Sequence, residues 1–255
     1  MPRLRPAVKE EMVKSLQRGK SLNTISKEFG IGKSTIYYYY KKMYGKKFIE
    51  PVFSPHNSEL EGEINGIFAG DGSQYYYAKR GSYQVNVHFG AKNYWYAVYV
   101  KQLFEQFFNK KFRLQYESET KIRIRTESKK IFNYFQNYLS YDRQIKHCTI
   151  KLKKNCSSSF KLGFLKGMFD TDGCLSYSKT EKNVRAFYTT TSQVLATQLG
   201  MMLTKLGIIH SVRSRRPSNT NEKMVYIVYI WRASTNRFIK TVKPMKALRA
   251  GNSAR

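Results

Sequence analysis

The chain has 255 residues, with 46 lysines and arginines against 17 aspartates and glutamates, so its formal net charge is +29. Hydrophobic residues make up 41% of the sequence, which is enough for a folded core and excludes a disordered basic tail. No apolar run is long enough to cross a bilayer, no secretory signal opens the chain and no lipid-facing lysine-rich helix stands out, so we expect no membrane partner. The charge indicates a polyanionic partner, and nucleic acid is the main candidate.

Three cysteines, Cys148, Cys156 and Cys174, have no CxxC spacing. We therefore predict neither a disulfide framework nor a zinc site, and we expect an intracellular protein in a bacterial or archaeal cytoplasm or an organelle. The four histidines have no ligand spacing and are interpreted as surface or hydrogen-bonded residues rather than as catalysts.

Residues 1–42 predict a small domain of three short helices. Gly19 ends the first helix, Ser21 caps the second and Gly30 makes the turn before the third. The string SLNTISKEFGIGKSTIYYYYKK resembles the helix-turn-helix of resolvase and transposase DNA-binding domains. That resemblance implies that the third helix enters the major groove. The alternative is a small protein-interaction module.

Residues 43–57 contain glycine, two prolines and two lysines with little periodicity. This composition predicts an extended linker. Its lysines, Lys46 and Lys47, are candidates for contacts with the DNA backbone.

The stretch GEINGIFAGDG at residues 62–72 has a counterpart, GFLKGMFDTDG, at residues 163–173, 101 positions later. Small residues recur every fourth position in both copies, so each copy predicts a helix with a narrow small face. Glycine destabilises a helix interior by about 1 kcal/mol relative to alanine, so this face indicates close packing of two backbones. Each helix ends in an acid, Asp71 or Asp172, followed by glycine.

If the two helices pack together, Asp71 and Asp172 meet at one end. Two carboxylates at the negative end of a helix dipole repel each other and require a cation between them. A divalent metal such as Mg²⁺ is the simplest choice, because it prefers hard oxygen ligands and bridges carboxylate and phosphate.

The pattern after each motif helix is the same. Residues 58–140 predict helix, hairpin, helix, hairpin and helix, and residues 159–255 repeat that order. We place a lysine-rich connection at residues 141–158, and the last helix at residues 236–242. The prediction is therefore a tandem α+β repeat behind an N-terminal helical domain.

INGIFAGDG and LKGMFDTDG resemble the two signature motifs of single-chain LAGLIDADG homing endonucleases, and the resemblance covers about residues 58–245. It implies two αββαββα units related by a pseudo-twofold axis, with saddle-shaped antiparallel sheets along the major groove. The implied function is double-strand cleavage of a specific DNA site, leaving 3′ overhangs, by a monomer that uses Mg²⁺ or Mn²⁺, with Ca²⁺ as a non-supporting substitute. Intron homing is the implied biological role.

The resemblance also implies the site residues. Asp71 and Asp172 are the expected catalytic metal ligands, together with the preceding carbonyls of Gly70 and Thr171. A basic residue near the metal is frequent in the family, and the matches by position in the last strand of each repeat are Arg125 and Arg232. Arginine steadies charge but does not relay protons, and the alternative for both residues is a plain phosphate contact. A further acid, Asp170, aligns with an alanine and is interpreted as structural.

The remaining candidates are polar side chains expected to contact DNA bases or phosphates. They are Lys33, Ser34, Tyr37, Tyr38, Lys46, Lys47, Gln74, Lys79, Arg80, Gln84, Asn86, Arg113, Lys121, Arg123, Lys153, Ser176, Lys179, Arg185, Arg213 and Arg215.

Two other functions share this fold. One is a DNA-binding regulator that has lost cleavage, against which the retention of both acids argues. The other is an RNA-splicing maturase whose partner is intron RNA, which basic groove residues serve equally well.

Overall fold

The computed structural model describes residues 4–45, 58–153, 156–178, 183–216 and 223–247. The chain divides into two compact units, residues 1–50 and residues 51–255, each of which is described separately below. The predicted Lys46, Lys47 and Lys179 lie outside the described residues. None of the helices in the described ranges is long and apolar enough to span a membrane.

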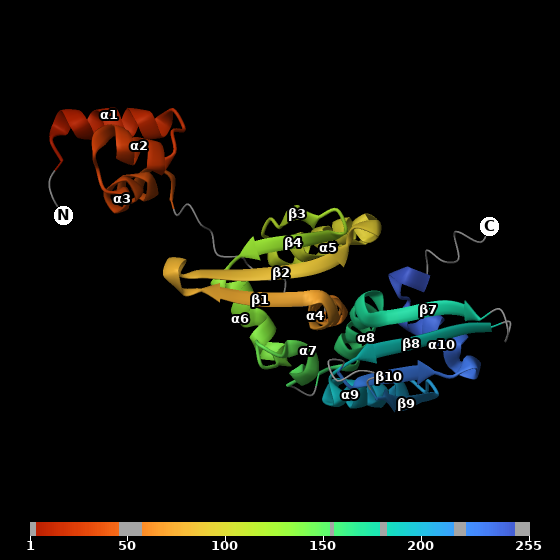
Figure 1. The fold of residues 1–255 in the computed structure, drawn as a ribbon. Coiled ribbons are helices and arrows are strands. Elements are labelled where there is room, and N and C mark those ends of the chain that lie inside the picture. Colours follow the sequence, from red (N-terminus) through yellow and green to blue (C-terminus); the bar gives the residue numbers. More distant parts are fainter. Residues whose placement is uncertain (1–3, 46–57, 154–155, 179–182, 217–222, 248–255) are drawn as a thin grey trace. The chain divides into compact units, whose positions relative to one another are not determined.

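The N-terminal unit contains three helices (Figure 1), namely α1 (Pro6–Gln17), α2 (Leu22–Phe29) and α3 (Lys33–Tyr44). The Ser21 hydroxyl accepts from the Thr24 amide and caps α2, and Gly30 ends α2 with a left-handed φ of 64°. Met12, Ile25 and Ile36 are fully buried at the centre of this unit. The apolar face of each short helix is therefore satisfied within the unit.

The second unit consists of two repeats of the same order of elements. The first repeat comprises α4 (Ser58–Asp71), β1 (Gly72–Tyr77), η1 (Ala78–Arg80), β2 (Ser82–Gly90), η2 (Ala91–Asn93), α5 (Tyr94–Phe108), β3 (Arg113–Ser118), β4 (Lys121–Glu127) and α6 (Lys129–Tyr138). The second comprises α8 (Ser158–Asp172), β7 (Gly173–Ser178), β8 (Asn183–Thr190), α9 (Gln193–Lys205), β9 (His210–Arg215), β10 (Val225–Ile230) and α10 (Arg232–Val242). The last helix thus begins four residues earlier than predicted, and Arg232 opens it instead of ending a strand.

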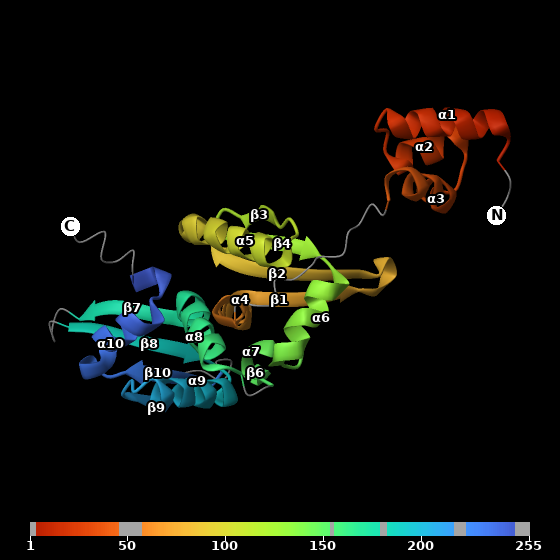
Figure 2. The same ribbon diagram turned by 180° about the vertical axis from the view of Figure 1, so that it is seen from behind.

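Each repeat has one four-stranded antiparallel sheet, ordered β1-β2-β4-β3 in the first and β7-β8-β10-β9 in the second. The helices α5 and α6 pack on one face of the first sheet, and α9 and α10 on one face of the second (Figures 1 and 2). Val85, Val87 and Ile124 point to those helices and are fully buried, because alternate strand residues share a face. The opposite face of each sheet is called the open face below. The predicted α+β tandem repeat is confirmed.

The connection between the repeats is more ordered than a linker. Leu139–Ser140 (β5) pairs with Lys151–Leu152 (β6), and a short helix, Lys146–Thr149 (α7), lies between them. The Gln198 side chain forms hydrogen bonds with both backbone groups of Leu152, accepting from its amide at 2.9 Å and donating to its carbonyl at 3.0 Å. These contacts tie the connection to α9.

The two motif helices, α4 and α8, pack backbone against backbone. A Cβ built on Gly62 or Gly66 would collide with the carbonyl of Phe160 or Phe164, and one built on Gly163 would collide with that of Glu59. Only glycine leaves room for this approach, which explains the recurrence of small residues on both helices.

Candidate metal centre and nucleic-acid interface

The close approach of α4 and α8 brings their C-terminal ends together. A Cβ built on Gly70 would overlap the Thr171 side chain and lie 3.2 Å from Asp172 Oδ2. Asp71 and Asp172, which directly follow these residues, therefore stand side by side where the two helices end.

Both carboxyl groups are half-buried, and each lies in the negative potential of the other. Burial, followed by the charge of Asp172, raises the pKa of Asp71 from 3.8 to about 7. Burial likewise raises the pKa of Asp172 to about 6. Lys146 and Lys246 act in the opposite direction on both acids. The pair therefore holds less negative charge at neutral pH than two exposed carboxylates would. A bound cation would stabilise the ionised form of both acids and would lower their pKa values again.

Lys146 comes from α7 and reaches the end of the first motif helix. Its ammonium donates to the carbonyl oxygens of Phe68 at 2.8 Å, Gly70 at 3.3 Å and Gly72 at 2.5 Å. Burial lowers the pKa of Lys146 to about 8, although both acids raise it. This amine can therefore exchange its proton near neutral pH.

Lys246 occupies the corresponding place in the second repeat. Its ammonium donates to the carbonyls of Thr171 at 3.0 Å and Gly173 at 2.8 Å. Asp170 anchors the segment that carries it, because the Met245 and Lys246 amides donate to its two carboxylate oxygens at 3.0 and 2.9 Å. Asp170 is thus a structural residue, as predicted, and what it does is position Lys246.

Neither lysine was predicted from the sequence, where two arginines were favoured instead. Arg125 pairs with Glu127 at 2.6 Å on the first sheet, and Arg232 is exposed at the start of α10. Among the described residues, the cations that act on Asp71 and Asp172 are Lys146 and Lys246. The two lysines are 100 residues apart, one short of the 101-residue repeat, so only a spacing search that tolerated a gap would have paired them.

The residues present fit a divalent cation. Two adjacent carboxylates and the carbonyls of Gly70 and Thr171 are hard oxygen donors of the kind that Mg²⁺ and Ca²⁺ prefer. Each carbonyl also accepts a hydrogen bond from a lysine in this structure, and a carbonyl oxygen has a second lone pair. No group of three or more histidine, cysteine or acidic side chains with metal-binding geometry occurs among the residues that the structure describes, so the acid pair is the best candidate.

A hydrogen-bonded chain of side chains lies on the open face of the first sheet beside Asp71. His88 is 3.0 Å from the Ser73 hydroxyl through Nε2 and 2.9 Å from Glu117 through Nδ1. Arg123 contacts the other oxygen of Glu117 at 2.9 Å. With Asp71, His88 and Glu117 line a hollow of about 500 Å³. His88 was interpreted from sequence as a surface or hydrogen-bonded histidine, but its alignment with a serine and an acid was not foreseen.

Most predicted DNA-contacting residues that the structure describes are exposed or half-buried, and the strand residues among them lie on the open faces. In the first sheet and its turn these are Lys79, Arg80, Gln84, Arg113, Lys121 and Arg123. In the second sheet they are Ser176, Arg185, Arg213 and Arg215. In the N-terminal unit Lys33, Ser34 and Tyr38 are exposed, and Tyr37 is half-buried and stacks on Tyr40.

Three of these residues differ from the prediction. Gln74 points to the helical side of its sheet, where its amide donates to the Phe132 carbonyl and its oxygen accepts from Tyr141. Asn86 shares the open face but is only 7% exposed and donates to the Ser73 hydroxyl at 3.5 Å. Lys153 donates to the Gln136 carbonyl at 2.7 Å and lies with the helices.

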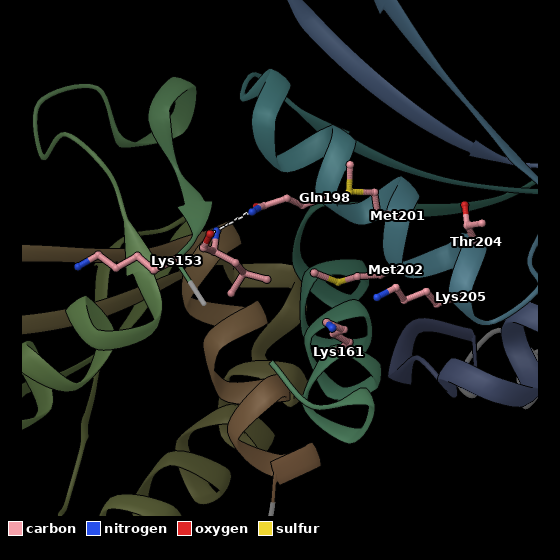
Figure 3. Close-up of a pocket in the computed structure, with 8 residues that line it drawn as sticks. Lys153, Lys161, Gln198, Met201, Met202, Thr204 and Lys205 are labelled. Carbon is pink, nitrogen blue, oxygen red and sulfur yellow. Dashed lines mark hydrogen bonds between the residues drawn. The ribbon is translucent and has the colours of Figure 1, made fainter. Parts of the chain in front are cut away.

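Lys153 also lines the cavity drawn in Figure 3, which has a volume of about 520 Å³. Met201 and Met202 of α9 and Lys161 of α8 lie around it. These residues are on the helical side of the second repeat, away from the paired acids. The cavity therefore takes no part in the site described above.

Known proteins resemble part of this chain in sequence and most of it in fold. Residues 159–243 match the family model of the LAGLIDADG-like domain. No curated protein matches the chain in sequence.

Solved structures resemble the second unit in fold. The crystal structure of I-DmoI in complex with DNA and Mn has a TM-score of 0.54 and 21% sequence identity, and the match covers 73% of this chain and 97% of that one. Mesophilic variants of the homing endonuclease I-DmoI give a TM-score of 0.53 at 21% identity, over 72% of this chain and 95% of theirs. I-SmaMI bound to its uncleaved DNA target in the presence of calcium ions has a TM-score of 0.46 and 13% sequence identity, and the match covers 72% of this chain and 85% of that one. Residues 159–243 are therefore similar to a LAGLIDADG-like domain, and the two repeats together have the fold of the homing endonuclease I-DmoI.

Proposed function

We propose that this protein is a site-specific DNA endonuclease that hydrolyses both strands of its target with Mg²⁺. The observation that carries the proposal is the pairing of Asp71 and Asp172 at the ends of two helices, each end contacted by a half-buried lysine. A structural pair of turn residues would require neither the second acid nor the lysines.

In this proposal the carboxylates of Asp71 and Asp172 and the carbonyls of Gly70 and Thr171 hold the metal. A divalent cation bound there supplies positive charge to the scissile phosphate and activates a water molecule. Each acid serves one strand, so the two cuts are made by one chain, and they leave 3′ overhangs as the family resemblance implies.

Lys146 and Lys246 orient the carbonyls that flank each acid and place a positive charge beside the reacting phosphate. The lowered pKa of Lys146, about 8, suits proton transfer to or from water in the site. Mn²⁺ would replace Mg²⁺, whereas Ca²⁺ would support binding without cleavage.

The N-terminal unit extends the contact with DNA. Lys33, Ser34 and Tyr38 are exposed on α3, and Lys33 and Ser34 lie at its N-terminal end, the part of a recognition helix that contacts base edges. This second contact lengthens the recognised site. Because both acids belong to one chain, a monomer is sufficient, and a DNA substrate places the protein inside a cell.

The test is selection from a randomised duplex library, with Ca²⁺ for binding and Mg²⁺ for cleavage, on the parent protein and on Asp71→Asn and Asp172→Asn. We expect one cut sequence with the parent in Mg²⁺, and retained binding without double-strand cleavage in each variant. Selection of one sequence with no cutting by the parent would indicate a regulator, and preference for a structured RNA over every duplex would indicate a maturase.

A further inference from the structure

The open faces of the two sheets can be compared residue by residue, because their strand registers correspond. Gly72 pairs with Val87 in the first sheet, and Gly173 pairs with Tyr188 in the second. One position further, Asn86 pairs with Arg125 in the first sheet, and Phe187 pairs with Tyr229 in the second.

On its open face the first sheet is polar, and its side chains are hydrogen-bonded to one another. His88 and Arg123, a register pair, are both held by Glu117. Arg123 also donates to the Gln115 oxygen at 3.4 Å. The hydrogen-bonding groups of His88, Glu117 and Arg123 are therefore already paired with one another on the open face of the first sheet.

The second sheet has apolar side chains at three open-face positions that are polar in the first sheet, because Phe187 and Tyr229 stand where the first sheet has Asn86 and Arg125. Phe187 and Tyr229 are in ring contact, with centroids 5.6 Å apart, and Ile227 stands where the first sheet has Arg123. All three are half-exposed. The core described for this unit includes their neighbours Tyr188 and Val228 but none of these three. They form what we call the apolar strip: Phe187, Ile227 and Tyr229.

Cationic side chains of β9 flank the apolar strip on one side. Arg213 lies over the Tyr229 ring at 5.6 Å, and Arg213 and Arg215 on the neighbouring strand are exposed. A partner that fits this surface has anionic groups that meet the arginines and apolar groups that contact the apolar strip. In the major groove of DNA the C5 methyl of thymine is the apolar group that a base edge presents, between two phosphate backbones.

We propose that the apolar strip reads thymine methyl groups in one half of the DNA target, whereas the first sheet reads the other half by hydrogen bonds. This inference rests on the proposed function for the duplex partner and adds a rule for its sequence. Burial of one methyl group stabilises a complex by about 0.8 kcal/mol, which corresponds to a roughly fourfold gain in affinity per thymine. The same contact would disfavour RNA, because uracil lacks that methyl group.

The test uses the duplex selected from the library, with each thymine replaced singly by deoxyuridine, and binding measured in Ca²⁺. Half-sites are assigned by which half loses selectivity in Arg213→Ala, for the second repeat, and in Arg123→Ala, for the first. We expect threefold to tenfold weaker binding at one or more replacements in the half read by the second repeat. Equal sensitivity in the two halves, or none in either, would overturn the inference.

The variant Phe187→Ala tests whether this side chain makes the contact with the thymine methyl group. In that variant the same deoxyuridine replacements should cost less than twofold, whereas Phe187→Leu, which keeps an apolar side chain, should preserve the parent's sensitivity. The matched control is Arg125→Ala, at the position in the first sheet that corresponds to Tyr229, and it should leave the methyl effect unchanged. An unchanged methyl effect in Phe187→Ala would contradict the proposal.

Failure of the proposed function gives a different result. Selective binding in Ca²⁺ with deoxyuridine sensitivity, but no cutting in Mg²⁺, would refute the nuclease and leave the thymine reading intact. Failure to select any duplex would refute both.

Discussion

The two repeats share one topology, but the ion pair between their motif helices is not symmetric. The small face of α4 meets that of α8, yet Glu63 of the first helix is ion-paired with Lys166 of the second at 2.9 Å without a symmetric counterpart. The position equivalent to Glu63 holds Phe164, and the position equivalent to Lys166 holds Asn65. The backbone approach and the paired acids are thus common to both halves, whereas the charges around them specify which half is which.

The largest expected effect is on stability, and it tests the close approach of the α4 and α8 backbones that both repeats share. Gly163→Val places a branched side chain against the Glu59 carbonyl, and we expect it to lower the free energy of unfolding by roughly 4 kcal/mol or more. The control is Gly90→Ala, because a Cβ there meets nothing closer than 4.0 Å, and chemical denaturation should show a change below about 1 kcal/mol. Similar losses in both variants would mean that close helix packing is not required.

The lysines test whether the two halves act independently. Lys146→Met should slow cleavage of one strand about 100-fold, and Lys246→Met should slow the other equally, because every hydrogen bond described for either ammonium goes to a carbonyl at or next to the end of its own motif helix. Gels that resolve the two labelled strands of the selected site would show nicked intermediates of opposite polarity. Equal slowing of both strands by either variant would contradict one lysine per strand, and exposed Lys92→Met serves as the control.

The ion pair sharpens the difference between the halves. Glu63 is buried and also accepts from the Tyr99 hydroxyl at 2.7 Å, so Lys166→Met leaves a buried carboxylate unpaired and should destabilise the protein by about 3 kcal/mol. The double variant Glu63→Gln/Lys166→Met should recover much of that loss in denaturant titrations. An additive double variant would show that the two charges do not interact.

Separated repeats extend the same comparison. In a pair of first repeats Glu63 would face an asparagine, and in a pair of second repeats Lys166 would face a phenylalanine. Each like pair would therefore bury an uncompensated charge, and we expect co-expressed halves to associate with each other in preference to themselves. Size-exclusion chromatography of the mixed and single halves would measure this.

The pH dependence of the free energy of unfolding is expected to change less than the stabilities of the packing and ion-pair variants above. The pKa of Asp71 rises from 3.8 to about 7 on folding, so the folded state binds the proton more tightly. The stability that this proton contributes is fully present below pH 3.8 and is lost as the pH rises to about 7. Asp71→Asn should therefore be more stable than the parent above pH 7, by on the order of 2 kcal/mol, and the difference should shrink toward pH 4. Thermal melts from pH 4 to 8 that run in parallel would contradict it.

The features that the sequence predicted correctly are those with a period. The glycine register and the alternation of Ile122 and Ile124 with cationic residues are repeated patterns with one physical cause each. Lys146 was missed because it lies in a connection without periodicity, and only tertiary packing returns it to the motif helix. Gln74 was assigned to the wrong face because β1 has serine and glutamine followed by three consecutive tyrosines, so neither face is marked by hydrophobicity.

Calcium binding by the parent and by Asp71→Asn and Asp172→Asn tests the central claim, a shared metal centre, most directly. Isothermal titration calorimetry with the selected duplex present would measure it without cleavage, and Asp142→Asn, an exposed acid of the connection, is the control. We predict that either motif substitution weakens calcium binding at least tenfold and that the control leaves it unchanged. Undiminished calcium binding by both motif variants would contradict a metal centre built on these two acids.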